Sequence, residues 1–163
     1  MKTSHPDQAS ADQSIEFAHF ALGRRGEELA AAYLDQQGYA IVAANFTLPV
    51  GRNLRGVIVN AEIDLVAYDD ETLCFVEVKT RASDWFAPPE ANVDRRKQRQ
   101  ITRAAGAYRR MFGLEDAPYR FDVVSIVLPA GGDDATQLQV ELLRNFWTEQ
   151  TLHKRRWSES YYD

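Results

Sequence analysis

Two strand-like segments joined by a short turn constrain the fold of this chain more than any other feature. Residues 61–80, AEIDLVAYDDETLCFVEVKT, are rich in aliphatic and aromatic residues, and a turn falls at residues 70–71. A hairpin closed at this turn places Asp64 opposite Glu77, with Cβ atoms roughly 4.5 to 5.5 Å apart. The same register gathers apolar residues on one face, which we expect to pack on a helix. That face comprises Ala61, Ile63, Leu65, Ala67, Cys74, Val76 and Val78.

The opposite face of this hairpin carries its charges at one end. Glu62 is expected opposite Lys79, next to the pair formed by Asp64 and Glu77. Two carboxylates this close repel each other unless a proton, a cation or a metal lies between them. Mg²⁺ or Mn²⁺ suits such oxygen ligands, and a neighbouring ammonium can orient a water for hydrolysis of a phosphodiester. For the E-x-K spacing alone, an edge hairpin with ordinary salt bridges is the alternative.

The remaining segments predict an α/β fold, a mixed β-sheet flanked by helices. Helices are expected at 16–37 and 95–112, and strands at 39–46, 61–68, 73–80, 120–128 and 138–143. We expect residues 1–15 to be a disordered leader, residues 16–147 to form one domain, and residues 148–163 to be a polar tail.

The first predicted helix has one broad apolar face. Glu27 falls at the edge of this face, whereas Glu28 points away from it. Two glycines on the face allow another backbone to approach closely. The face consists of Leu22, Gly23, Gly26, Leu29, Ala30, Tyr33 and Leu34.

Composition and charge argue against several classes of protein. Cys74 is the only cysteine and the chain has three histidines, so the sequence predicts neither an internal disulfide nor a zinc site. Its apolar runs are too short to span a bilayer, so we expect a cytoplasmic protein without a membrane partner. A net charge of −5 disfavours indiscriminate coating of nucleic acid, which makes local basic patches informative.

One such patch lies on the second predicted helix, which has seven cations and no acid between Arg95 and Arg110. The apolar face of this helix consists of Ile101, Ala104, Ala105, Tyr108 and Phe112. Most of the cations lie off this face, where they can meet phosphates or simply solvate the helix. Lys97 stands one turn before Ile101 on the inward side, within expected reach of the acids. Arg81 could contact a phosphate or pair with a nearby acid. The candidate phosphate contacts are Arg81, Arg96, Lys97, Arg99 and Arg103.

These segments resemble a known superfamily. The hairpin resembles the metal site of the PD-(D/E)xK nucleases, which have the restriction-endonuclease-like fold, with Asp64 as the D and residues 77–79 as the E-x-K. The segments GRRGEELAAAYLDQQGYAIVAANF, DRRKQRQITRAAGAY and RFDVVSI resemble more narrowly the YraN-type family of small bacterial proteins. That family is related by fold to archaeal Holliday junction resolvases. The resemblance runs from about Leu22 to Leu128.

The resemblance implies a role for each matching residue. Asp64, Glu77 and the Val78 carbonyl would ligate Mg²⁺ or Mn²⁺, and Lys79 would stand beside the attacking water. Glu27 matches a helix glutamate of the resolvases and would be a second catalytic residue that assists the metal or the water. It implies a metal-dependent nuclease acting on nucleic acid, DNA in particular and branched DNA among its candidates. A homodimer is a further expectation by analogy with the resolvases.

Two readings of the function stay open. The alternative to the nuclease is a non-catalytic nucleic-acid-binding or assembly module that retains the fold. The chain also departs from its relatives at residues 47–60, which are longer than the usual loop before this strand. This longer segment is expected to reshape the substrate cleft without affecting the predicted metal ligands.

Overall fold

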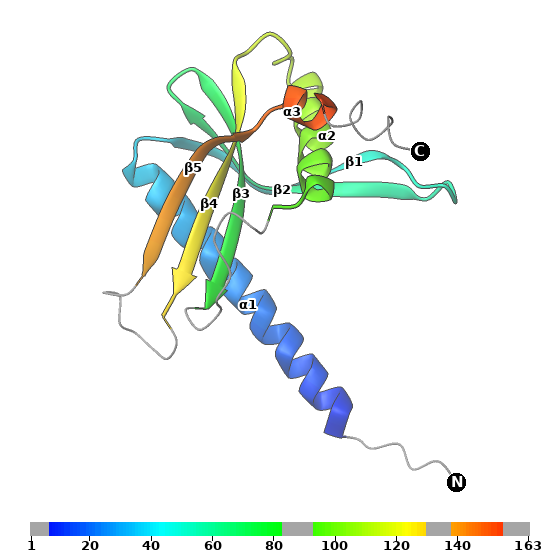
Figure 1. Cartoon of the computed structure of the whole chain (residues 1–163), viewed down its shortest axis with the longest axis vertical. Helices are drawn as coiled ribbons and strands as arrows, with labels where there is room; N and C mark the ends of the chain where they lie inside the picture. Colours follow the sequence, from blue (N-terminus) through cyan, green and yellow to red (C-terminus); the bar gives the residue numbers. More distant parts are fainter. Residues whose placement is uncertain (1–6, 83–92, 130–137, 155–163) are drawn as a thin grey trace.

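In the part of the chain that the structure describes, five strands form one mixed sheet (Figure 1). The computed structural model describes residues 7–82, 93–129 and 138–154. The strand order is β1-β2-β3-β4-β5, in which β3 and β4 are parallel and the other neighbours are antiparallel. The predicted α/β class with a mixed sheet is confirmed. The elements are α1 (Asp7–Gln36), β1 (Ala40–Arg52), β2 (Ile58–Asp69), β3 (Thr72–Ala82), α2 (Arg95–Met111), β4 (Tyr119–Leu128), β5 (Gln139–Trp147) and α3 (Glu149–Lys154).

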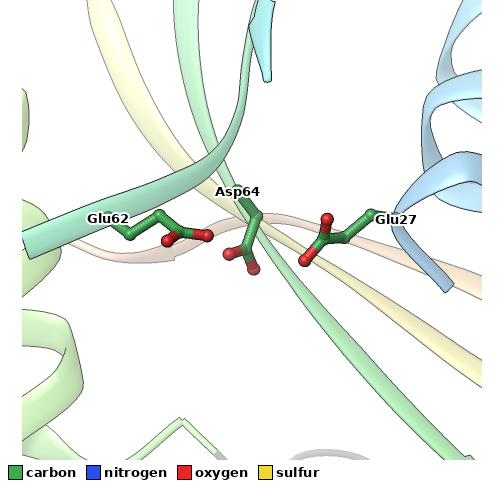
Figure 2. A group of neighbouring side chains, drawn as sticks. All are labelled: Glu27, Glu62 and Asp64. Atoms are coloured by element: carbon green, nitrogen blue, oxygen red, sulfur yellow. The ribbon is translucent and has the colours of Figure 1, made fainter. Parts of the chain in front are cut away.

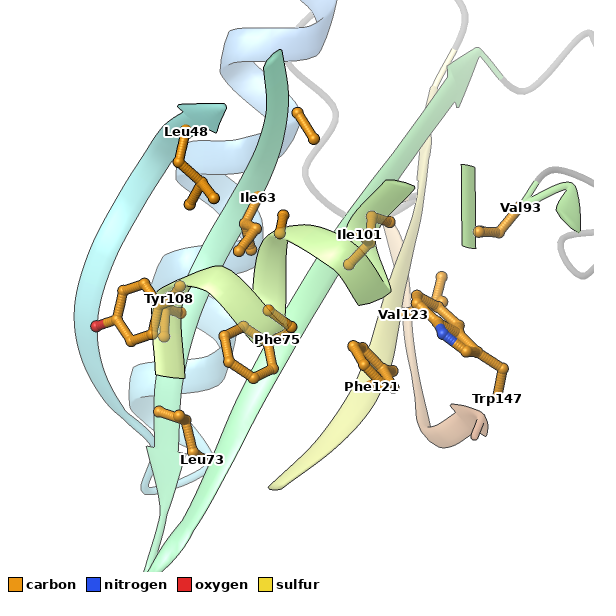
Figure 3. Packing of buried hydrophobic residues seen from close by; sticks show 14 of the residues in the cluster. Leu48, Ile63, Leu73, Phe75, Val93, Ile101, Tyr108, Phe121, Val123 and Trp147 are labelled. Atoms are coloured by element: carbon orange, nitrogen blue, oxygen red, sulfur yellow. The ribbon is translucent and has the colours of Figure 1, made fainter. Parts of the chain in front are cut away.

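Helices cover both faces of the sheet and bury a separate apolar cluster on each. On one face α1 contributes Ala30 and Leu34, which pack with Val76 and Val124 of the sheet. On the other face α2 packs on aromatic and aliphatic side chains of β2, β3 and β4 (Figure 3). Phe121 there stacks on Trp147, with ring centroids 4.8 Å apart. Both layers are needed because each face of a central strand is apolar.

The register predicted for the β2–β3 hairpin is confirmed near its turn. Leu65 pairs with Val76 and Asp69 pairs with Thr72, as the sequence indicated. Pairing between the two strands ends at Leu65 and Val76, whereas β3 continues to pair with β4 as far as Ala82. Beyond this point β2 and β3 separate, and Glu62 therefore does not lie opposite Lys79 as predicted.

The predicted apolar face of the hairpin is wrong at its outer end. Ile63 and Ala61 belong to the buried cluster under α2, together with Val66, whereas Leu65 belongs to the cluster under α1. A regular strand would keep Ile63 and Leu65 on one face, so β2 must rotate near Asp64. The neighbouring strand β1 has a matching irregularity, because Asn45 adopts a left-handed conformation with φ of 49°.

The first helix has the predicted buried face but begins earlier than expected. Gly26, Ala30 and Leu34 are buried, Glu27 is half-buried, and Glu28 is exposed. The helix begins at Asp7 instead of Glu16, so part of the expected leader is helical; residues 1–6 lie outside the described residues. This N-terminal part extends beyond the sheet (Figure 1).

The second helix buries the predicted residues and starts at a defined cap. The side chain of Asp94 accepts a hydrogen bond from the backbone N–H of Lys97 at 2.8 Å, a standard N-cap arrangement. Ile101, Ala104, Ala105 and Tyr108 are buried as expected, but Phe112 follows the helix and is exposed. Within the predicted tail, residues 149–154 form α3 and bury Leu152; residues 155–163 lie outside the described residues.

Residues 47–60, here named the arm, are the outer part of the β1–β2 hairpin. The arm is paired as far as Arg52 and Ile58 and projects beyond the rest of the sheet (Figure 1). In its turn, the Asn53 side chain accepts hydrogen bonds from the backbone N–H groups of Arg55 and Val57 at 2.9 and 3.0 Å. Residues 47–60, which are longer than the loop usual at this position, therefore form an ordered extension of two strands. Across the described part of the chain, each helix is too short or too polar to cross a bilayer.

Candidate metal centre

The carboxylate of Asp64 lies at the point where β2 and β3 separate. Its Oδ2 atom accepts a hydrogen bond from the backbone N–H of Val78 at 2.8 Å. The side chain thus takes the place of a strand partner for that N–H group, which satisfies a backbone donor where the ladder has ended. Asp64 is buried, with 8% of its surface exposed. Val78 was predicted to contribute its carbonyl, and that role stays a prediction.

Three carboxylates from two elements meet at this point. Glu27 comes from α1, and Glu62 and Asp64 come from β2. One oxygen of each lies within 4.8 Å of the others, and the three side chains point toward one another (Figure 2). Because Glu27 is far from the hairpin in sequence, the packing of α1 on the sheet creates this cluster.

Glu77 adds a fourth carboxylate with two ammonium groups beside it. Its Oε1 atom lies 3.1 Å from Nζ of Lys79 and 3.6 Å from Nζ of Lys97. Lys97 reaches it from the first turn of α2, at the position that the helical pattern predicted. Glu77 is almost fully buried, with 3% of its surface exposed.

Burial and mutual repulsion raise the pKa of two of these acids. Removal from water, together with the charge of Glu77, raises the pKa of Asp64 to about 8, although the Val78 N–H and the charge of Lys97 act in the opposite direction. The pKa of Glu27 is also raised, mainly by burial and further by the charges of Glu62 and Glu77. A hydrogen bond with Asn45 opposes this rise. Such repulsion favours either protonation or binding of a cation.

The donor set fits a hard divalent cation. All four side chains offer oxygen, which is the donor that Mg²⁺ and Mn²⁺ prefer. The Oε2 atom of Glu77 is buried and has no hydrogen-bond partner within the described part of the chain. A buried carboxylate oxygen without a partner is costly unless a ligand satisfies it. The site therefore has both the chemistry and an unsatisfied oxygen suited to a cation.

Glu62 is the residue that sequence reasoning missed as a site residue. It was expected to face Lys79 across the hairpin, but it joins Glu27 and Asp64 instead. The error follows from treating β2 as a regular strand paired with β3 along its whole length. The left-handed conformation of Asn45 and the rotation of β2 near Asp64 carried no clear signal in the sequence.

The predicted nucleic-acid contacts differ in their exposure to solvent. Arg96, Arg99 and Arg103 are exposed on α2, off its buried face. Arg81 follows Lys79 on β3, and its Nε and one terminal nitrogen are buried without a hydrogen-bond partner among residues 7–82, 93–129 and 138–154. A phosphate contact by Arg81 or its pairing with a nearby acid stays a prediction.

A hollow of about 470 Å³ opens beside the carboxylates. Phe20 and Arg24 of α1 form one wall, and Asn45 and Glu62 of the β1–β2 hairpin form another. Glu27 also lines this space. Glu27 and Glu62 therefore face an open volume, whereas Asp64 and Glu77 are buried next to them.

The fold and the site together define a class of protein. It is an α/β protein whose mixed sheet is compatible with a restriction-endonuclease-like fold and which carries an acidic cluster where two central strands separate. The family model described as "Uncharacterised protein family UPF0102" matches residues 26–126. The chain belongs to the UPF0102 family.

Individual relatives agree with this assignment. A UPF0102 protein of Desulfosudis oleivorans is 42% identical over 123 residues, which cover 76% of this chain and 86% of the relative. A UPF0102 protein of Porphyromonas gingivalis is 45% identical over 114 residues, 70% of this chain and 76% of the relative. One of Chlorobium chlorochromatii is 40% identical over 131 residues, 79% of this chain and 93% of the relative.

Proposed function

We propose that this protein is a divalent-metal-dependent nuclease that hydrolyses phosphodiester bonds in nucleic acid. The observation that carries the proposal is the unpartnered, buried Oε2 atom of Glu77 beside a cluster of three further carboxylates. This arrangement is unfavourable for stability alone, because burial and neighbouring carboxylates raise the pKa of Asp64 and of Glu27. The resemblance of the hairpin to the PD-(D/E)xK metal site supports the same function.

Asp64, Glu77, Glu27 and Glu62 would hold the cation, together with the Val78 carbonyl that the resemblance implies. A bound Mg²⁺ or Mn²⁺ would offset the carboxylate charge, polarise the phosphate and make water more acidic. Asp64 is fixed for this task by its 2.8 Å hydrogen bond with Val78. The protein thus supplies a preorganised set of oxygen ligands.

The ammonium groups have a complementary task. Lys79 lies 3.1 Å from Glu77 at the rim of the site, where it can donate a hydrogen bond to an attacking water or to a phosphate oxygen. Lys97 stands in the first turn of α2, where the partial positive charge of the helix N-terminus also favours a phosphate. The exposed Arg96, Arg99 and Arg103 extend this positive surface along the helix.

The test is a cleavage and binding assay with single-stranded, duplex, flap and four-way-junction substrates in the presence of Mg²⁺ or Mn²⁺. We expect the wild type to cut at least one of these substrates, and Glu77→Ala and Lys79→Ala to lose cleavage while they stay folded. Glu27→Gln is expected to reduce cleavage. Glu28→Gln is its matched control, because Glu28 is the next residue on α1 but is exposed to solvent.

The outcomes separate the nuclease from the non-catalytic module. Binding of branched or duplex substrate without cleavage under every cation would assign the protein to the module class. A protein that neither cuts nor binds, and whose acids take up no Mn²⁺, would contradict both functions.

A further inference from the structure

The tip of the arm has an unusual surface for a projecting hairpin. Leu54 is fully exposed, and Val57 and Ile58 are 58% and 52% exposed. Exposed aliphatic side chains that lie together, instead of being scattered singly, mark a contact site. The turn itself is well defined, since Asn53 organises it and Arg52 donates a hydrogen bond to the Gly56 carbonyl at 2.7 Å.

The charge of the arm is complementary to a polyanion. Residues 47–61 contain Arg52 and Arg55 and no acidic residue, in a chain whose net charge is −5. Where the arm leaves the sheet, Pro49 and Val50 line a hollow of about 500 Å³ together with Arg103 and Arg110 of α2 and Glu149 of α3. The two arginines outnumber the one acid in this lining, so the arm continues a surface of α2 that has a net positive charge.

The arm also has a fixed relationship to the metal centre. Its inner end includes Thr47, which pairs directly with Glu62. At ~3.3 Å per residue, the strand from Thr47 to Arg52 spans roughly 17 Å. The same length corresponds to about five base pairs of a duplex at ~3.4 Å each.

We propose that the arm contacts duplex nucleic acid about five base pairs from the metal centre, with Leu54 entering a groove as an apolar wedge and Arg55 meeting the backbone. Proteins that enter the minor groove combine apolar wedges with arginine in this way. A second protein chain fits less well, because three aliphatic side chains and two arginines are far fewer than the roughly 20 to 30 residues each side contributes to a stable protein interface. The inference rests on the proposed function for the position of the scissile phosphate, and it names the substrate as a duplex that extends beyond that phosphate.

The test compares the full-length wild type with Leu54→Ala and Arg55→Ala in binding to duplexes of increasing length, with Ca²⁺ in place of Mg²⁺ to prevent cleavage. Arg52 is left unchanged because its side chain supports the turn. Met111→Ala is the matched control, since Met111 is also an exposed apolar residue but lies at the end of α2. Thermal unfolding checks that each variant is folded.

We expect all proteins to bind a very short duplex equally, and both arm variants to bind a long duplex more weakly than the wild type and Met111→Ala do. Arg55→Ala should also lower the slope of log affinity against log salt by about one. Leu54→Ala should leave that slope unchanged, because it removes no charge.

Equal affinities of the arm variants and the wild type on long duplexes would overturn the proposal, even if the wild type cuts DNA. Arm-dependent binding without cleavage under Mg²⁺ or Mn²⁺ would support the arm proposal and contradict the nuclease. Arm variants that change the oligomeric state in light scattering, but not duplex affinity, would show instead that the arm joins two copies of this chain.

Discussion

Gly26 of α1 lies against Thr80 of β3 so closely that no side chain fits between them. A Cβ atom built on Gly26 would lie 1.7 Å from Oγ1 of Thr80 and 2.8 Å from its Cβ. This contact brings α1 down onto the sheet one residue before Glu27, and so places that carboxylate beside Asp64. Glycine at position 26 is thus a requirement of the site as well as of the packing.

Gly26→Ala should therefore destabilise the protein, by about 1 to 3 kcal/mol, because the helix must move away from β3. Gly23→Ala is the matched control in the same helix, since nothing lies within 4 Å of a Cβ there. Alanine at that position should stabilise the helix by about 0.5 to 1 kcal/mol. Urea unfolding measures both values, and Gly26→Ala should cost much less in a Thr80→Gly background than in the wild type. Equal effects of the two alanine substitutions would contradict the close contact.

Asp64 should make the metal-free protein less stable as the pH rises. Its pKa is raised to about 8 from an ordinary value of 3.8, so between these values the folded state holds a proton that the unfolded chain has released. The free energy of unfolding then falls with rising pH across this window. Above the window, Asp64 is ionised in the folded state and its whole destabilising effect is present. Glu27, whose pKa is also raised, acts with the same sign.

Asp64→Asn should remove the part of the pH dependence of stability that comes from Asp64. The amide oxygen can still accept the hydrogen bond from the Val78 N–H, but the side chain cannot ionise. In buffer containing EDTA, we expect the Tm of this variant to rise relative to the Tm of the wild type from pH 5 to pH 8. Asp70→Asn, an exposed change in the turn of the same hairpin, should show no such trend. A difference in Tm that does not depend on pH would refute the electrostatic origin.

Glu62 should contribute to cation binding although its predicted position was elsewhere. Its carboxylate is one of three that lie within 4.8 Å of one another, and ligand charge sets the affinity for hard cations. We expect Glu62→Gln to weaken Mn²⁺ binding on the order of tenfold by isothermal titration calorimetry. Glu28→Gln should bind Mn²⁺ as the wild type does. If Glu62→Gln bound Mn²⁺ as tightly as the wild type does, Glu62 would not be a cation ligand.

Among the acids outside the carboxylate cluster, Asp122 should be the one whose loss destabilises the protein most. It is fully buried, accepts hydrogen bonds from Nε of Arg120 at 3.0 Å, and accepts another from the backbone N–H of Asn145 at 2.8 Å. Asp122→Ala leaves the guanidinium and the N–H group without these partners, at a cost of about 3 to 5 kcal/mol in urea unfolding. Asp116→Ala, an exposed change, should cost much less. Similar losses in the two variants would argue against this network.

The sequence alone determined those features that depend on local periodicity. The buried residues of α2 and the register from Leu65 to Asp69 in the β2–β3 hairpin followed from alternation and helical spacing, because an error of one residue would expose an apolar face. The edge position of Glu27 and the inward position of Lys97 followed from the same spacing. The functional roles of these residues remain predictions.

Tertiary structure decided how the acids come together. Strand β2 leaves its partner at Asp64, where a side chain replaces a backbone partner for Val78, and β1 adapts through the positive φ of Asn45. These changes depend on contacts between segments distant in sequence, so local patterns could not reveal that Glu62 would turn toward Glu27. The projection of the arm has the same origin, because a strand's length is set by the partner it finds as well as by its own residues.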